Sequence, residues 1–318
     1  MNDGNISYSL SRRAYLAGGL ATMGANISGC LESNPANTDS SSISAVNGSF
    51  FMLYDLARQV AGDQLLVEDL VPTGSHGDDW EPSPGIIEDI ANADVFVYIS
   101  GFRTWSDDIA ATLPDDYPDV VVIDAAEGIE YIEGETGRDV DPHFWLDPLL
   151  TQEAVKNIRD GFADADPEHA AVYEENADDF LDQLTNVHEQ YEEAMNHRRT
   201  DVIVIGSHDS FQYWTERYDL DIYSPVGISP DGQPTAQELA EITDIVEEND
   251  LEYVLYDKYE PKDYAQSIAA ETNTDLLPLS PIEATTQEQL EADMGYIEHM
   301  LEINLHTLEA ALDVEYSD

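Results

Sequence analysis

The chain has very little positive charge. Only 12 of its 318 residues are lysine or arginine, against 67 aspartates and glutamates, which gives a formal net charge of −55. Nucleic acids and anionic membrane surfaces bind proteins through clustered positive charge, so neither is expected as a partner. Concentrated salt would screen the repulsion between so many acidic groups. We therefore expect a protein from a high-salt environment, and an unchanged melting temperature at millimolar salt would contradict this.

Cysteine is almost absent as well. Cys30 is the only one, so no disulfide forms within the chain and no thiolate set is available for a closed structural zinc site. It ends the segment Ile-Ser-Gly-Cys, which looks like a lipoprotein processing box. Ser-Arg-Arg-Ala-Tyr-Leu at 11–16 resembles a twin-arginine export signal, and the apolar run that follows is too short to span a bilayer.

These features predict a signal peptide over residues 1–29 and a polar tether over 30–42 that begins with a lipid on Cys30. The mature protein would then lie outside the cell, anchored by that lipid to the outer face of the membrane. The alternative is an ordinary apolar N-terminal helix with an incidental thiol.

Beyond the tether, short apolar runs alternate with amphipathic segments. Four or five consecutive apolar residues leave no solvent-facing side, so such runs indicate buried strands of a mainly parallel α/β sheet. The chain is longer than a single core usually grows, which favours two domains. We predict α/β lobes over 43–165 and 199–318. The runs that indicate strands are 95–99, 120–123, 202–205, 253–256 and 276–279.

A long helix is predicted between the two lobes. From Pro167 to about Arg198 there is no glycine and no further proline, and apolar residues recur at three- and four-residue spacings. About 30 helical residues would span roughly 45 Å, which is more than one layer of a small domain needs. We therefore assign residues 166–198 as a linker helix.

The segment Asp141–Pro148 places a histidine between two Asp-Pro pairs. Each proline fixes its own φ and biases the preceding residue toward extended geometry, so His143 is expected on a stiff, non-helical segment. Asp147 and Pro148 also have the residue types that begin a helix.

Two other histidines are predicted in loops rather than helices. His208 follows the strand run 202–205, and ligands of α/β sheets bind outside the carboxyl ends of strands. His76 lies in a glycine-containing loop with Asp78, and glycine lets a backbone approach a ligand closely. The remaining histidines fall in predicted helices, where packed or solvated positions are expected.

From about Ile43 onward the chain resembles the zinc- and manganese-binding solute receptors of ABC importers. The resemblance is carried by Val-Pro-x-Gly and Glu-Pro-x-Pro at 71–74 and 81–84, by Asp141–Pro148, and by His-Asp-x-Phe-x-Tyr at 208–213. It implies two α/β lobes joined by one long helix, with His143 as the second metal ligand and His208 as the third. It also implies delivery of the metal to an ABC permease and its ATPase subunit.

The chain departs from this family at the first and fourth ligands. The family's first histidine usually stands three residues before Glu-Pro, where this chain has Asp78, with His76 two residues earlier. Both stay open as first ligand. The fourth ligand is usually a carboxylate after the last strand, and Glu283 is the nearest acid in that loop. Asp147 and Asp209 are expected to orient the ligand rings through the nitrogen that does not bind metal.

Imidazoles with carboxylates suit Zn²⁺, Mn²⁺ or Fe²⁺ better than Ca²⁺ or Mg²⁺, and acid should release the ion because ligating imidazole must be neutral. We predict a monomeric binding protein, not an enzyme, that captures zinc or manganese. A metal-dependent hydrolase is the alternative, since catalytic zinc also has three protein ligands, but the chain has no His-Glu-x-x-His segment. A surface adhesin or metal chaperone on the same fold is a further alternative.

Overall fold

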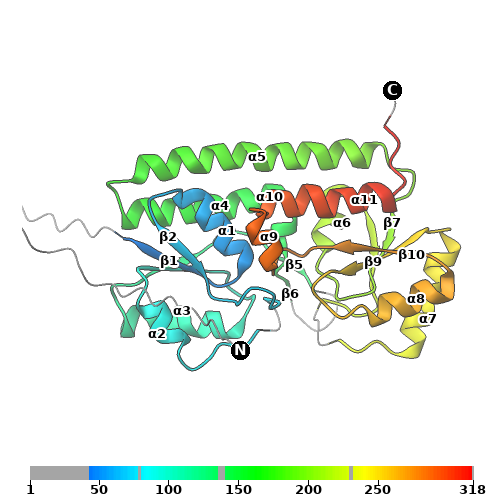
Figure 1. The fold of residues 1–318 in the computed structure, drawn as a ribbon, viewed down its shortest axis with the longest axis horizontal. Coiled ribbons are helices and arrows are strands. Elements are labelled where there is room, and N and C mark those ends of the chain that lie inside the picture. Colours follow the sequence, from blue (N-terminus) through cyan, green and yellow to red (C-terminus); the bar gives the residue numbers. More distant parts are fainter. Residues whose placement is uncertain (1–42, 78–79, 135–139, 229–231, 317–318) are drawn as a thin grey trace, which may run out of the picture. The chain divides into compact units, whose positions relative to one another are not determined.

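The architecture is described from a computed structural model (Figure 1). It describes residues 43–77, 80–134, 140–228 and 232–316, which all lie within one compact unit, Ser40–Asp318. The predicted signal peptide, the tether with Cys30, and Asp78 lie outside the described residues.

The first sheet is wholly parallel, with the strand order β2-β1-β3-β4. Helices α1 and α4 cover the face toward α5, and α2 and α3 lie on the other face (Figure 1). Val95, Phe96 and Val97 of the central strand β3 are fully buried, as expected for a strand covered on both sides. The bounds are β1 Ala45–Gly48, α1 Phe51–Ala61, β2 Leu66–Asp69, α2 Ile86–Ala91, β3 Val95–Tyr98, α3 Thr104–Asp116, β4 Val121–Asp124 and α4 Pro148–Ala165.

The second sheet is also parallel. Strand β7 pairs with β8, β9 pairs with β10, and a bridge between Ile205 and Leu255 joins the two pairs. Helices α7 and α8 pack together with β7 and β9, and the C-terminal helical segments contact β10 from another side. The bounds are β7 Val202–Val204, α6 Gln212–Tyr218, β8 Asp221–Tyr223, α7 Ala236–Glu248, β9 Tyr253–Asp257, α8 Asp263–Thr272 and β10 Asp275–Leu279.

Helix α5 (Ala170–Asn196) runs alongside both sheets (Figure 1). Its 27 residues give a length of about 40 Å. The buried residues Tyr173, Ala177, Phe180 and Leu184 follow the predicted three- and four-residue spacing. Helix α5 packs on α1 and α4 of the first half. In the second half it packs on α6, on α10 (Tyr296–Glu298) and on the π-helical segment His299–Leu305. It therefore ties the two halves together along their length.

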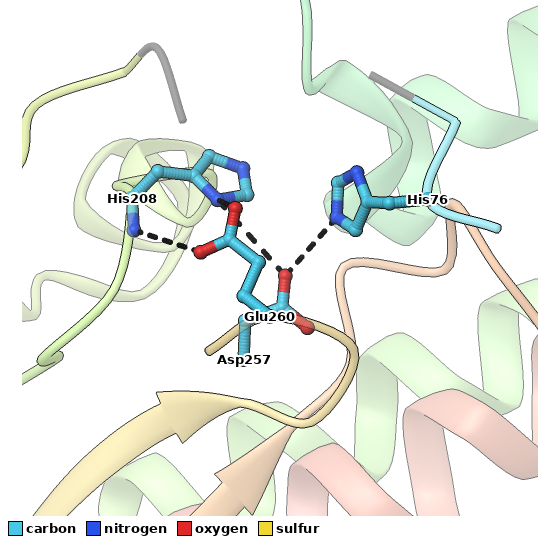
Figure 2. Close-up of side chains that lie close together, drawn as sticks. All are labelled: His76, His208, Asp257 and Glu260. Atoms are coloured by element: carbon cyan, nitrogen blue, oxygen red, sulfur yellow. Dashed lines mark hydrogen bonds and ion pairs between the residues drawn. The ribbon is translucent and has the colours of Figure 1, made fainter. Parts of the chain in front are cut away.

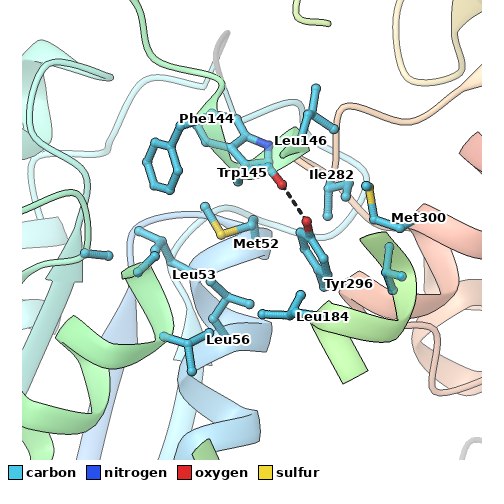
Figure 3. Packing of buried hydrophobic residues seen from close by; sticks show 14 of the residues in the cluster. Met52, Leu53, Leu56, Phe144, Trp145, Leu146, Leu184, Ile282, Tyr296 and Met300 are labelled. Atoms are coloured by element: carbon cyan, nitrogen blue, oxygen red, sulfur yellow. Dashed lines mark hydrogen bonds between the residues drawn. The ribbon is translucent and has the colours of Figure 1, made fainter. Parts of the chain in front are cut away.

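Between the halves lie a short antiparallel hairpin and a 3-10 turn. The hairpin consists of β5 (Ile132–Glu133) and β6 (Val140–Asp141), and the turn η1 covers Phe144–Leu146. Side chains from both halves meet here in one continuous core (Figure 3). The hydroxyl of Tyr296 donates to the carbonyl of Trp145 at 2.6 Å, across 151 residues of sequence.

The apolar spacing of residues 287–312 predicts a C-terminal helix, but the structure divides this segment. It consists of α9 (Gln287–Glu291), α10 (Tyr296–Glu298), a π-helical segment η2 (His299–Leu305) and α11 (His306–Ala311). The break comes at Asp293, which has φ 53°, and at Gly295, where a Cβ would lie 2.6 Å from a carboxylate oxygen of Asp55. Buried Asp55 accepts the Tyr296 N–H at 2.7 Å, so a distant side chain starts the new helix.

The predicted fold class, α/β with mainly parallel sheets, is confirmed. The exact lobe and linker boundaries, 43–165, 166–198 and 199–318, stay predictions. Among the described residues, no helix has both the length and the apolar character that crossing a membrane requires.

Candidate metal centre

The candidate ligands come from loops at the carboxyl ends of parallel strands. His76 follows β2, His208 follows β7 and Glu283 follows β10, while Asp257 is the last residue of β9. Parallel strands end at the same edge of their sheet, so these loops bring side chains from distant parts of the sequence together. His143 joins them from the segment between β6 and η1.

Asp141 fixes the ring of His143. Its Oδ1 lies 2.6 Å from His143 Nδ1 and also accepts the His143 backbone N–H at 2.9 Å. The other ring nitrogen, Nε2, is thereby turned toward Glu283, 3.3 Å from its Oε1. An acceptor on the far nitrogen of a ligand histidine sets its tautomer and orientation.

Asp147 has only one of the two roles that the sequence predicted for it. Its carboxylate caps α4 by accepting the Leu149 N–H at 2.9 Å, and it pairs with Arg217 at 2.7 Å. The helix start was therefore predicted well, whereas the partner of the His143 ring is Asp141. The proline after each of these two aspartates made them look equivalent in the sequence.

His208 is held by Ser210 rather than by Asp209. The Ser210 hydroxyl lies 3.0 Å from His208 Nε2, while the carboxylate of Asp209 accepts from the side chain of Gln212. The second ring nitrogen, Nδ1, lies 2.7 Å from Oε1 of Glu260. Ser210, and not the predicted Asp209, is therefore the partner of the Nε2 ring nitrogen.

His76 lies between two carboxylates. Its Nδ1 is 3.3 Å from Glu283 Oε2, and its Nε2 is 3.2 Å from Asp257 Oδ2. The loops of His76 and Glu283 are in direct contact: Gly74 N–H donates to the Thr285 carbonyl at 2.8 Å. A Cβ on Gly77 would lie 3.1 Å from the Glu283 carbonyl, so glycine permits this approach. Asp78, the alternative first ligand, lies outside the described residues.

The geometry brings these side chains into two overlapping groups that could each hold a metal ion. We call His143, His208 and Glu283 the inner group, and His76, His208, Asp257 and Glu260 the outer group; within each, the candidate ligand atoms lie within 4.8 Å of one another. Figure 2 shows the outer group. Asp257 and Glu260 were not predicted from the sequence, although Asp257 directly follows the predicted strand 253–256 and could have been found by the same rule as His208.

Several buried atoms of these groups make no hydrogen bond within the described part of the chain. They are His143 Nε2, His208 Nδ1, Glu260 Oε1 and both carboxylate oxygens of Glu283. Burying such atoms without a partner is costly unless something satisfies them. They approach one another as ion pairs, 3.3 Å between His143 Nε2 and Glu283 Oε1 and 2.7 Å between His208 Nδ1 and Glu260 Oε1. Nitrogen and oxygen atoms that converge in this way fit a divalent cation.

The charges of the cluster reinforce this interpretation. Burial alone would lower the pKa of His76, but the negative charges of Glu283 and Asp257 outweigh it and raise that pKa to about 10. Burial likewise opposes the charge of His143, and Asp141 and Glu283 raise its pKa to about 10. The metal-free cluster thus favours positive charge at its centre, which a metal ion supplies as protons leave.

Aromatic side chains form one wall of the centre. The ring of Trp145 lies 5.1 Å from that of His143, and Phe102 and Phe50 pack on Trp145 at 5.2 and 5.3 Å between ring centres. Trp145 Nε1 donates to the Pro281 carbonyl at 2.7 Å. It thereby links the His143 segment to the loop that carries Glu283.

The loop of Glu283 is fixed from behind by the C-terminal helical segment. Asn304 exchanges two hydrogen bonds with the Ser280 backbone, each 2.8 Å, and His299 Nδ1 lies 2.7 Å from the Ser280 hydroxyl. Ile282 has φ 63°, a conformation that costs a β-branched residue energy and persists only when its surroundings impose it. These contacts therefore set the position of the next residue, Glu283.

His299 is expected to make folding sensitive to acid. Burial, with a smaller contribution from Lys258, lowers its pKa from 6.5 to about 3. As the pH falls, the unfolded chain therefore binds this proton at a higher pH than the folded chain does. The stability that comes from keeping His299 neutral is complete above pH 6.5 and is lost as the pH falls toward about 3, by roughly 1.4 kcal/mol per pH unit. Between pH 7 and 5, the free energy of unfolding of the metal-free wild type in urea should therefore fall more steeply than that of His299→Gln. Parallel curves would contradict this, and exposed His306→Gln is the control.

Comparison with known proteins agrees with the fold. Residues 46–311 match the family model of the zinc-uptake complex component A, periplasmic, and the chain belongs to this family. It is 27% identical over 281 residues to the high-affinity zinc uptake system protein ZnuA of Bacillus subtilis, covering 84% of this chain and 87% of that one.

The zinc-binding lipoprotein AdcA of Streptococcus pneumoniae is 29% identical over 279 residues, and this chain spans only 55% of its length. The Zn(II)-bound ZnuA-like domain of that AdcA has a solved structure that covers 85% of this chain and 99% of its own. Its TM-score is 0.73 at 30% identity.

Proposed function

We propose that this protein captures a divalent transition metal ion outside the cell, zinc in preference to manganese, and delivers it to an ABC permease and its ATPase. The observation that carries the proposal is the convergence of buried ring nitrogens and carboxylate oxygens without hydrogen-bond partners among the described residues. His143, His208, His76 and Glu283 would hold the ion. Three imidazoles and one carboxylate suit tetrahedral Zn²⁺, and the names of the relatives point to the same metal.

The same ligand count favours binding over catalysis. A catalytic zinc keeps one position open for water, whereas three imidazoles and Glu283 would fill all the positions of a tetrahedral ion. The aromatic wall of Trp145 and Phe102 also limits access of a substrate to the ion from the His143 side. We therefore propose a binding protein without enzymatic activity.

Delivery to a permease requires that the protein stay near the membrane. We propose that the twin-arginine segment exports the folded chain and that a lipid on Cys30 anchors it as a monomer on the outer face. Replacing Cys30 by alanine should move the protein from the membrane fraction to the medium, and retention in the membrane fraction would contradict the anchor. The net charge of −55 supports a high-salt environment for this surface.

Metal analysis of the purified wild-type chain tests the proposed function. After loading and desalting, we expect one zinc ion per chain by elemental analysis. In competition calorimetry, zinc should displace manganese, because imidazole-rich sites hold Zn²⁺ more tightly than Mn²⁺. A chain that binds neither metal stoichiometrically would contradict the proposal, and one that binds manganese more tightly would contradict the preference for zinc.

A further inference from the structure

The outer group offers a metal ion a second set of ligands beside the inner one. Glu260 Oε1 lies 2.7 Å from His208 Nδ1, and Asp257 Oδ2 lies 3.2 Å from His76 Nε2 and 4.0 Å from His208 Nδ1 (Figure 2). Glu260 and His208 thus form a buried ion pair in the absence of metal. A divalent cation that takes the place of the proton between them would be bound by both atoms.

Asp257 is positioned for this role by its neighbours. Its backbone N–H donates to the Ser207 hydroxyl at 3.0 Å, and its Oδ1 accepts the Tyr259 N–H at 2.8 Å. These contacts leave Oδ2 directed between the rings of His76 and His208. The carboxylate is fully buried, so its orientation is set by the protein and not by solvent.

The two groups share ligands, so one ion cannot use both fully at once. His208 belongs to both groups, and its Nδ1 faces Glu260 of the outer group. His76 faces Glu283 with one nitrogen and Asp257 with the other. Moving between the groups therefore exchanges His143 and Glu283 for Asp257 and Glu260.

The groups also differ in depth and in chemistry. His143 and Glu283 are fully buried, whereas the side chain of Glu260 is 10% exposed and lies on the turn that follows β9. Carboxylate oxygens accept a range of divalent ions, while the imidazoles of the inner group favour zinc. Of the carboxylates in the two groups, Glu260 is therefore the one most exposed to solvent.

We propose that Asp257 and Glu260, with His76 and His208, form an outer binding site for the divalent cation, through which it enters and leaves the inner site. This inference rests on the proposed function, since both sites bind the same ion. It predicts that either site alone retains one ion per chain, and that binding fails only when both are damaged.

A double-mutant cycle with zinc tests the outer site. Glu260→Gln removes a charge from the outer site, Glu283→Gln removes one from the inner site, and exposed Glu271→Gln on α8 is the control with the same chemical change. Zinc affinity is measured against a competing chelator, with circular dichroism to check folding. Glu260→Gln should change the affinity of the wild type by less than about threefold, but weaken that of Glu283→Gln by at least about tenfold.

Other results would overturn the outer site. If Glu260→Gln had no effect in either background, Glu260 would not bind the ion. If it weakened binding equally in both, Glu260 would be one more ligand of a single site. A crystal structure of zinc-loaded Glu283→Gln gives an independent reading: the ion should lie beside Asp257 and Glu260, and an ion beside His143 would contradict the proposal. A wild type that binds no zinc would instead refute the proposed function itself.

Discussion

Replacing His208 by alanine is expected to abolish stoichiometric zinc binding. His208 belongs to both groups of candidate ligands, and its ring is fully buried, so no other group can take its place without moving the loop after β7. Loss of a partner that merely supports a ligand costs roughly 10- to 100-fold in metal affinity, and loss of the ligand itself should cost more. His143→Ala should weaken binding strongly but less completely, because His143 belongs to the inner group alone. Calorimetry and elemental analysis of desalted protein measure both effects.

The control for this experiment is His306→Ala, since His306 is exposed on α11. It should bind zinc as the wild type does. The circular dichroism of each metal-free variant is compared with that of the wild type to establish that the fold is retained. Undiminished stoichiometric binding by both His143→Ala and His208→Ala would overturn the assignment of the site.

Replacing Trp145 by alanine should cause a large loss of stability. Trp145 is fully buried against Phe50, Phe102 and Phe144, and removal of a buried tryptophan typically costs about 3–5 kcal/mol. The change also breaks the bond from Nε1 to the Pro281 carbonyl, which links the His143 segment to the Glu283 loop. We therefore expect a lower free energy of unfolding in urea and a weaker zinc affinity together.

Trp145→Phe separates these two contributions. Phenylalanine retains most of the aromatic packing but leaves the buried Pro281 carbonyl without its donor, which should cost about 1–3 kcal/mol. Its zinc affinity should fall because the Glu283 loop loses a fixed contact. If Trp145→Ala unfolded at the same urea concentration as the wild type, the continuous core between the two halves would not be the main source of stability.

Much of the fold could be predicted because its signals are local. The apolar runs at 95–99 and 202–205 form the buried strands β3 and β7, and the spacing of apolar residues from Tyr173 to Tyr191 marks the buried face of α5. The interruption of the C-terminal helix could not be predicted. It depends on Asp55, which is 241 residues from Tyr296 in the sequence and reaches it only in the folded chain.

The candidate site was only partly visible in the sequence. His143 and His208 stood out because they lie outside helices, whereas Asp257 and Glu260 are acids in a chain that contains 67 of them. The presence of an acidic side chain therefore did not identify a metal ligand. Burial does distinguish Asp257 and Glu283 from surface acids, but it is known only from the fold. Asp141 was missed as the partner of His143 because Asp147 occurs in the same Asp-Pro context.

A crystal structure of the wild-type protein with zinc tests the central claim most directly. The account predicts one ion bound by His143 Nε2, His208 Nδ1, Glu283 and His76, at the roughly 2.0–2.2 Å expected for zinc–nitrogen and zinc–oxygen bonds. Ligation by Asp78 in place of His76 would change only the first ligand. An ion bound elsewhere, with His143, His208 and Glu283 not coordinating it, would contradict the account.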